Sequence, residues 1–217
     1  MVATDAGLER RATPRQARAR ERVEAILAAA QSIIEKDGVE PLSTQRIALV
    51  AGIPVGSVYQ FFPNKHSIVL ELAKRSLVPM NALVDSTSPA PAGEDEWRAW
   101  WETYLDALVA MWRQDSSGGA IWSACAGTPE LFARASDLEL EYARGLAGLL
   151  SPLFAHDPVE VQERRAVVLA RMIAFGLDCA WNTGSWDEEA AQIVKRSAVA
   201  SLAAEIRASR SAAALAR

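Results

Sequence analysis

Residues 44–75 read TQRIALVAGIPVGSVYQFFPNKHSIVLELAKR, and their pattern constrains the fold more than any other part of the chain. Ser43 or Thr44 can cap a short helix here, because a hydroxyl oxygen can accept a hydrogen bond from a free N–H of the first helical turn. Apolar residues follow, and Gly52 ends this helix. The pattern therefore predicts one short capped helix followed by a tight turn.

A second short helix is expected from Val55 to about Phe61. Pro54 favours its start, because proline has a fixed φ and lacks the N–H that the first turn would leave unbonded. Pro63 and Asn64 then break the chain, and a longer helix starts near Lys65. This spacing is that of a helix-turn-helix.

In a helix-turn-helix, the second short helix lies in the major groove of DNA with its first residues facing the base edges. Thr44 and Lys65 are placed to clamp phosphates, whereas the small residues after the turn would let the helix sit deep in the groove. Simple packing is the alternative role for Tyr59, and a solvated surface position is the alternative for Arg46. The candidate DNA-binding residues are Thr44, Gln45, Arg46, Pro54, Val55, Gly56, Ser57, Tyr59, Gln60, Phe61 and Lys65.

This segment resembles the DNA-binding region of the tetracycline-repressor (TetR/AcrR) family. The matching features are Thr44, Ile47-Ala48, Ala51-Gly52-Ile53, Gly56, Tyr59, Phe62 and Lys65, and the match covers roughly residues 20 to 75. The resemblance implies a three-helix head, a six-helix ligand-binding body and a homodimer formed mainly by the last two helices. It also implies phosphate contacts from Thr44, Gly56, Tyr59 and Lys65, and packing inside the head for Val58 and Phe62. Phe61 departs from the family, which often has His there, so the resemblance does not support a DNA contact from Phe61.

The rest of the chain reads as helices separated by loops. Apolar residues at helical spacing predict helices over about 16–38, 65–80, 97–112, 129–153, 158–181 and 187–206. Residues 85–95 read as a linker, and residues 115–128 read as a flexible stretch rich in Ser, Gly and Ala. The second half of the 158–181 helix is apolar almost all round, which predicts burial on several sides.

No alternating strand pattern occurs, so the predicted fold is all-α, with about nine helices. The expected domains are a basic arm over 1–15, a helix-turn-helix domain over 16–63, and a ligand-binding and dimerisation domain over 64–217. The dimer is expected to form through the last two helices, at about 158–182 and 187–209.

The distribution of charged residues also distinguishes an N-terminal part of the chain from a C-terminal part. Residues 1–80 hold 11 Lys+Arg against 8 Asp+Glu, whereas residues 81–217 hold 12 against 19. A polyanion such as DNA is attracted to the first part and repelled by the second. Ordinary fluctuation would also explain an excess this small, so the motif carries the argument.

Composition narrows the classes of protein further. The longest apolar run, 167–181, is too short and too charged to span a bilayer, and the N-terminus does not read as a secretory signal, so a cytoplasmic protein without a membrane span is expected. Cys125 and Cys179 lack metal-ligand spacing and read as buried thiols. Neither nucleotide-binding nor hydrolase motifs occur, so no cofactor, no metal and no enzymatic activity are expected.

Six of the seven tryptophans lie between residues 97 and 181, where they could line a cavity for an apolar or aromatic ligand. Packing is the favoured alternative for most of them. Arg171 and Asp178, two turns apart, could pair across a dimer or contact a polar ligand group, and an ion pair is the favoured interpretation. The candidate ligand-binding residues are Trp100, Trp101, Tyr104, Leu108, Trp122, Phe132, Phe175 and Trp181.

These features predict a ligand-responsive transcriptional regulator, a repressor in its simplest form, that binds an inverted-repeat operator as a homodimer. A small apolar or aromatic effector would release it from double-stranded DNA. The alternative is a helical ligand-binding or interaction module without specific DNA binding. Equal binding to operator and scrambled duplexes would favour that alternative.

Overall fold

The computed structural model describes residues 17–93, 96–182 and 185–215, and these ranges contain nine α-helices. The predicted arm, residues 1–15, lies outside them. The helices are α1 (Ala17–Asp37), α2 (Thr44–Ala51), α3 (Val55–Phe61), α4 (Lys65–Ser86), α5 (Glu96–Gln114), α6 (Gly118–Gly127), α7 (Pro129–Leu150), α8 (Val159–Cys179) and α9 (Glu188–Leu215).

Two short elements complete the described chain. A 3-10 helix, η2 (Ser151–Phe154), follows α7, and an antiparallel ladder of two residues on each side joins β1 (Trp181–Asn182) to β2 (Ser185–Trp186). The all-α fold class is confirmed, with this ladder as the single extended feature of the described residues.

The helices form two compact units. The first comprises Met1–Ser76 with Ser117–Asp137, and the second comprises Leu77–Ser116 with Leu138–Arg217. This division differs from the predicted boundary at residue 63, because the first half of α4 and all of α6 group with the head. The helices α4 and α7 each contribute to both units. The assignment of DNA binding and ligand binding to separate domains stays a prediction.

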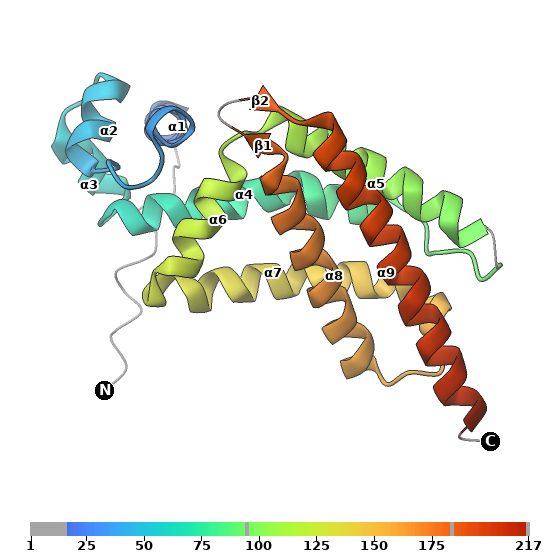
Figure 1. Cartoon of the computed structure of the whole chain (residues 1–217). Helices are drawn as coiled ribbons and strands as arrows, with labels where there is room; N and C mark the ends of the chain where they lie inside the picture. The colour runs from blue at the N-terminus through green and yellow to red at the C-terminus, as the bar shows by residue number, and fades with distance from the viewer. Residues whose placement is uncertain (1–16, 94–95, 183–184, 216–217) are drawn as a thin grey trace. The chain divides into compact units, whose positions relative to one another are not determined.

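In the first unit, α1, α2 and α3 pack around one core (Figure 1). Each helix supplies at least one side chain with no exposed surface, and the first turn of α4 adds another; these residues are Ile26, Ile47, Val58, Phe62 just after α3, and Ile68. The predicted apolar stripe of α1, from Val23 to Ile34, is buried in this core. Burial of such side chains contributes about 1.5–3 kcal/mol each, so helices too short to be stable alone are held by packing.

The helix predicted over about 65–80 is shorter than the α4 that the structure shows. The helix does not fade near Met80 but continues to Ser86, with Pro79 inside it. The cost of the proline is offset because Met80 and Val84 are buried. A Cβ added at Gly145 of α7 would lie 2.8 Å from a Val84 methyl, so α7 lies very close to this part of α4. Residues 87–93 form the non-helical connection that follows.

The prediction of a flexible stretch over 115–128 was wrong, since α6 occupies most of it. Ile121 and Cys125, one helical turn apart, are both buried. The Trp122 indole donates a hydrogen bond to the Ser76 hydroxyl of α4, at 3.1 Å, and this contact fixes α6 within the first unit. Tertiary contacts therefore override the low helix propensity of the local Gly and Ser residues.

In the second unit, α8 and α9 run side by side, and α5 also packs on α9 (Figure 1). A Cβ added at Gly176 would lie 2.8 and 3.0 Å from the two Val194 methyls, so a glycine is what lets α8 approach α9 this closely. Arg165 joins the two helices at their other end, 2.9 Å from Glu205 and 3.0 Å from Asp157.

Asp187 caps α9, because its carboxylate oxygen accepts a hydrogen bond from the Ala190 N–H at 3.0 Å. Arg171 and Asp178 both have partners within the unit. Arg171 pairs with Glu139 at 2.5 Å, and Asp178 accepts a hydrogen bond from the Trp112 indole at 3.0 Å. Within the chain Arg171 therefore pairs with Glu139 rather than with Asp178, and a pairing of Arg171 with Asp178 across a dimer stays a prediction.

Among the described residues, no helix combines the length and the apolar character needed to cross a membrane.

Candidate nucleic-acid interface

The turn between α2 and α3 is built by three local devices. Ser43 caps α2 through its hydroxyl oxygen, which accepts a hydrogen bond from the Arg46 N–H at 3.2 Å. Gly52 has φ +66° and ψ +32°, the left-handed conformation that glycine adopts most readily, and its N–H bonds back to the last turn of α2. Ile53 donates to the Ala48 carbonyl at 3.0 Å. These bonds turn the chain sharply before Pro54.

The leading turn of α3 is exposed. Pro54 and Gly56 are exposed, Val55 is 40% exposed, and Ser57 is half-buried. A Cβ added at Gly56 would meet no atom of the other described residues within 4 Å, the adjoining backbone of α3 aside. Packing inside the chain therefore does not require a glycine at this position, although a glycine within a helix costs about 0.5–1 kcal/mol relative to alanine.

A chain of hydrogen bonds links α2 to the end of α3. The hydroxyls of Thr44 and Tyr59 lie 2.9 Å apart, and the Thr44 hydroxyl also donates to the side-chain carbonyl of Gln45 at 3.2 Å. Since a hydroxyl has one proton, Tyr59 is then the donor to Thr44. Thr44 is buried and Tyr59 is 39% exposed, so the phenol is the accessible end of this chain.

The two cationic candidates are half-buried. The Arg46 guanidinium is paired with the Asp37 carboxylate at the end of α1. Lys65 begins α4, and the Asn64 side chain accepts the Ser67 N–H at 3.0 Å to cap that helix. A phosphate approaching Arg46 must therefore compete with a carboxylate. Sequence reasoning missed Asp37 because its pairing depends on how α1 packs against α2.

The structure separates Phe61 from the other candidates. Phe61 is only 4% exposed and lies in the core, like Val58 and Phe62, whose packing role the resemblance implied. Gln45 and Gln60 are exposed. Nine of the eleven candidates are thus exposed or half-buried on α2, just before or on α3, or at the start of α4, and the buried Thr44 is hydrogen-bonded to the exposed Tyr59, whereas the Phe61 ring lies in the core.

Part of the predicted ligand-binding set comes together in the second unit. The rings of Trp101 and Tyr104 stack with centroids 5.3 Å apart, and the Trp100 ring stacks 6.0 Å from Trp101. Leu108 is buried one turn further along α5. The indole N–H of Trp101 is buried and has no hydrogen-bond partner among the residues that the structure describes. An unsatisfied buried donor of this kind costs about 1–3 kcal/mol, and a hydrogen-bond acceptor placed beside it would remove that cost.

Tyr142 of α7 joins this aromatic group, with its hydroxyl 2.8 Å from that of Tyr104. Burial raises the pKa of Tyr142 to about 12, although its hydrogen bond with Tyr104 opposes the shift, and burial also raises the pKa of Tyr104. Both phenols are therefore neutral near pH 7. Sequence reasoning placed Tyr142 on an apolar helix face but could not pair it with a residue 38 positions away.

The remaining predicted ligand residues do not join the group. Trp122 and Phe132 belong to the first unit, and Phe132 is 51% exposed. Trp181 packs edge-on against Trp186 in the short ladder, at 5.6 Å. Phe175 is 74% exposed on α8.

The exposure of Phe175 belongs to a wider apolar face, which corrects the expectation that α8 is buried on several sides. Val161, Val168, Met172, Phe175 and Cys179 follow one another at intervals of seven, four, three and four residues, and all are exposed. This spacing places them on one side of the helix. Cys179 is consequently not a buried thiol, whereas Cys125 is.

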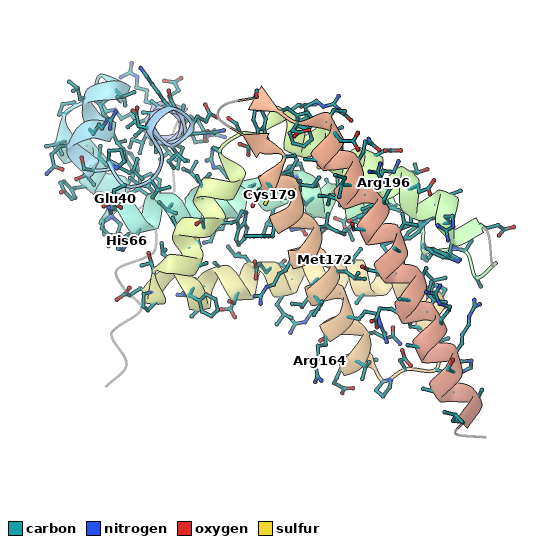
Figure 2. All side chains as sticks on the ribbon, in the orientation of Figure 1. Glu40, His66, Arg164, Met172, Cys179 and Arg196 are labelled. Carbon is teal, nitrogen blue, oxygen red and sulfur yellow. The ribbon has the colours of Figure 1, made fainter. Side chains whose placement is uncertain are left out.

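Beside this stripe, α9 exposes mainly small residues. Ile193 is 50% exposed, and Ser197, Ala200, Ala204 and Ala208 continue its line along the helix. The Ser201 hydroxyl lies 3.8 Å from the Met172 sulfur, so the exposed sides of α8 and α9 adjoin. Figure 2 labels Met172 and Cys179 on α8 and Arg196 on α9. We name these ten residues (Val161, Val168, Met172, Phe175, Cys179, Ile193, Ser197, Ala200, Ala204 and Ala208) the α8–α9 face.

Within the described part of the chain, no group of three or more His, Cys, Asp or Glu side chains is arranged to hold a metal ion.

Comparisons with known proteins agree with this geometry. Residues 26–72 match the family described as "Bacterial regulatory proteins, tetR family", and residues 95–206 match the "Tetracyclin repressor-like, C-terminal domain". Among curated proteins, no significant match is found.

Solved structures with the same fold cover nearly the whole chain. A TetR-family transcriptional regulator from Streptomyces coelicolor is 27% identical, with a TM-score of 0.61 over 84% of this chain and 98% of its own. NalD, the secondary repressor of the MexAB-OprM multidrug efflux pump in Pseudomonas aeruginosa, is 22% identical, with a TM-score of 0.57 over 85% and 96%. RolR, solved in complex with resorcinol, is 16% identical, with a TM-score of 0.55 over 88% and 94%.

Proposed function

Because this chain belongs to the tetracycline-repressor family of bacterial transcriptional regulators, we propose that it is a ligand-responsive repressor that binds an inverted-repeat operator as a homodimer. A small apolar or aromatic effector releases it from the DNA. The protein acts where the DNA is, in the cytoplasm.

The main support for DNA binding is that α3 has a glycine, Gly56, where packing within the chain does not require one. No neighbour in the described part of the chain would collide with a side chain there, yet the helix bears the cost of a glycine. A close approach by an external backbone supplies the reason, and a DNA strand beside the leading turn of α3 is such a backbone. Pro54, Val55 and Ser57 then face the base edges, where the Val55 methyls suit a thymine methyl group.

Phosphates are held around this turn by Thr44, Tyr59 and Lys65. A phosphate oxygen only accepts hydrogen bonds, so it requires donors from the protein. While Tyr59 donates to Thr44, the Thr44 proton can turn from Gln45 to a phosphate, and Tyr59 donates to a phosphate when its own proton turns away from Thr44. Gln45, Arg46 and Gln60 complete the contact surface. Phe61, being buried, is left out of it.

The α8–α9 face supports the homodimer. A contiguous apolar stripe on one helix and small residues on the next allow close packing against a second copy of the same face. Two heads in such a dimer would enter successive major grooves, about 34–36 Å apart if the half-sites are one turn apart.

The effector site is proposed at Trp101, Tyr104, Leu108 and Tyr142. The unpartnered Trp101 N–H offers a donor to a ligand acceptor, and the stacked rings offer an aromatic surface. Because α4 and α7 contribute to both units, a rearrangement around this site can be carried along them to the head. The effector weakens DNA binding only by its differential affinity for the two states of the dimer.

Gly56→Ala tests DNA binding separately from folding. The variant is expected to raise the free energy of unfolding by about 0.5–1 kcal/mol, because alanine is the better helix former, and to weaken DNA binding roughly tenfold or more, because the new methyl group meets the DNA. Binding is measured by fluorescence anisotropy on duplexes from the region upstream of the chain's own gene. Scrambled duplexes of equal length and composition are the control.

Wild-type binding that is equal on upstream and scrambled duplexes would contradict specific recognition. A Gly56→Ala variant that is stabilised and binds DNA as well as wild type would remove the main support for the proposed contact. For the effector, resorcinol and related phenols are titrated against the complex, with Trp101→Phe as the variant that should lose the response. A response to these phenols that Trp101→Phe leaves unchanged would place the effector site elsewhere.

A further inference from the structure

A groove of about 560 Å³ lies between α5 and α9 in the second unit, apart from the aromatic group and the DNA-binding head. Its floor is apolar and includes Val199, Ala200 and Ala203 of α9. Four cationic side chains line it, although residues 77–116 and 138–217 together hold 11 Lys+Arg against 17 Asp+Glu. A positively lined groove is therefore unexpected in this acidic unit.

Two ion pairs establish how the walls of the groove are aligned. Arg113 near the end of α5 pairs with Glu188 at the start of α9, and Asp106 pairs with Lys195 at 2.6 Å. The two helices therefore run antiparallel. Arg98 precedes Asp106 by eight residues on α5, so it lies level with Ala203, which follows Lys195 by eight residues on α9. Arg207 is one helical turn beyond Ala203. Arg98 and Arg207 thus line the same end of the groove from opposite walls.

The cationic groups of the groove differ in their partners. Lys195 pairs with Asp106, and Arg196 pairs with Glu189 at 3.3 Å. The Arg98 guanidinium instead lies 5.3 Å from the centre of the Trp97 ring. Among the described residues, no carboxylate lies within ion-pair distance of Arg98 or Arg207. The end of the groove between these two arginines is accordingly open to an anion from outside.

We propose that this groove binds a small organic acid, whose carboxylate or phosphate group is held between Arg98 and Arg207. Planar guanidinium groups match the oxygens of both acids. The volume exceeds what an inorganic ion needs and lies in the range of small-molecule sites. The carbon chain of the acid lies on the apolar floor and passes Glu102, one turn from Arg98, in the direction of Gln192, so a polar uncharged or cationic group is accommodated at the end away from the arginines.

The site is separate from the proposed effector site and does not depend on DNA binding. Its occupation would bridge α5 and α9, and the groove adjoins the proposed dimer interface, because Ala200 belongs both to the groove floor and to the α8–α9 face. The experiment measures the dissociation constants of hexanoate, 6-aminohexanoate and n-hexyl phosphate by isothermal titration calorimetry on the full chain. Neutral 1-hexanol is the control ligand, and comparing hexanoate with hexyl phosphate identifies the preferred acid.

At least one acid should bind saturably and roughly tenfold or more tightly than hexanol, because hydrogen bonds to charged groups are the strong ones. Arg98→Gln and Arg207→Gln should each weaken it roughly tenfold or more. Arg164→Gln, which removes an exposed arginine of α8 outside the groove, and Trp101→Phe in the aromatic group should leave it unchanged. Thermal unfolding of each variant confirms that it folds.

The proposal would be overturned if no acid bound saturably at millimolar concentration, or if hexanol bound as tightly as the acids. It would also be overturned if Arg98→Gln and Arg207→Gln both bound the acid as tightly as Arg164→Gln does. Loss of binding in Trp101→Phe alone would assign the acid to the aromatic group instead. The salt dependence of binding provides a second readout. Added salt should weaken the binding of the acids, because it screens their ion pairs with the arginines, and should leave the binding of hexanol unaffected.

Discussion

At the residue scale, Asp37 restrains a DNA-binding candidate by pairing with Arg46. Replacing Asp37 with Asn removes a negative charge and frees the guanidinium. We therefore expect Asp37→Asn to bind DNA several-fold more tightly at low salt. The slope of the logarithm of the DNA association constant against the logarithm of salt concentration should become steeper by about one unit, since one more phosphate is neutralised. A salt titration of binding measures both effects.

Glu40→Gln is the matched control for this prediction, because it removes a carboxylate from the same connection between α1 and α2. Glu40, which Figure 2 labels, is exposed, and Arg46 pairs with Asp37 rather than with Glu40. If both variants change DNA binding equally, general charge rather than release of Arg46 explains the result.

Sequence reasoning identified most of the residues around the α2–α3 turn but not their partners. Ser43, Gly52 and Pro54 act on backbone groups a few positions away, so their roles follow from local chemistry. Thr44 and Tyr59 are 15 positions apart, and their hydrogen bond exists only because α2 and α3 pack together. The burial of Phe61 follows from the same packing.

At the element scale, two glycines in long helices are expected to respond in opposite ways to alanine. Gly148 of α7 has open space where a Cβ would be, so Gly148→Ala should raise the free energy of unfolding by about 0.5–1 kcal/mol. Gly176 of α8 faces Val194, so Gly176→Ala should lower it by about 1 kcal/mol after the helix-propensity gain is subtracted from the overpacking cost. Urea denaturation measures both.

A Gly176→Ala variant as stable as Gly148→Ala would show that α8 and α9 can separate without cost.

The helix α6 is a case in which the local residues favour a loop but tertiary contacts produce a helix. Its Gly and Ser residues predict flexibility, yet the burial of Ile121 and Cys125 holds the helix. Propensity is a weak preference, and a few buried side chains outweigh it.

At the scale of the whole molecule, the dimer depends on the α8–α9 face. Val168 lies in this face and is 61% exposed, and Val78 of α4 lies outside it and is 65% exposed. Val168→Glu should raise the dimer dissociation constant roughly tenfold or more, because each subunit would bury an unpaired charge in an apolar interface. Sedimentation equilibrium measures the change, and DNA binding should weaken in parallel.

Val78→Glu adds the same charge at a similarly exposed valine and should leave both dimerisation and DNA binding unchanged. Equal effects of the two variants would indicate that added charge in general, rather than loss of the α8–α9 face, disrupts the dimer. A monomer in the wild-type chain at all concentrations would exclude the dimer itself.

By itself, the sequence determined the all-α class, the bounds of α1 to α3 and the turn between them, because caps, prolines, glycines and helical periodicity act over a few residues. Only the tertiary structure decided where α4 ends, that α6 exists, that Tyr104 meets Tyr142, and that α8 presents an apolar face outward. These features depend on which side chains distant segments bury against one another. The free energy of burial is shared among residues far apart in the chain, so no local pattern records it.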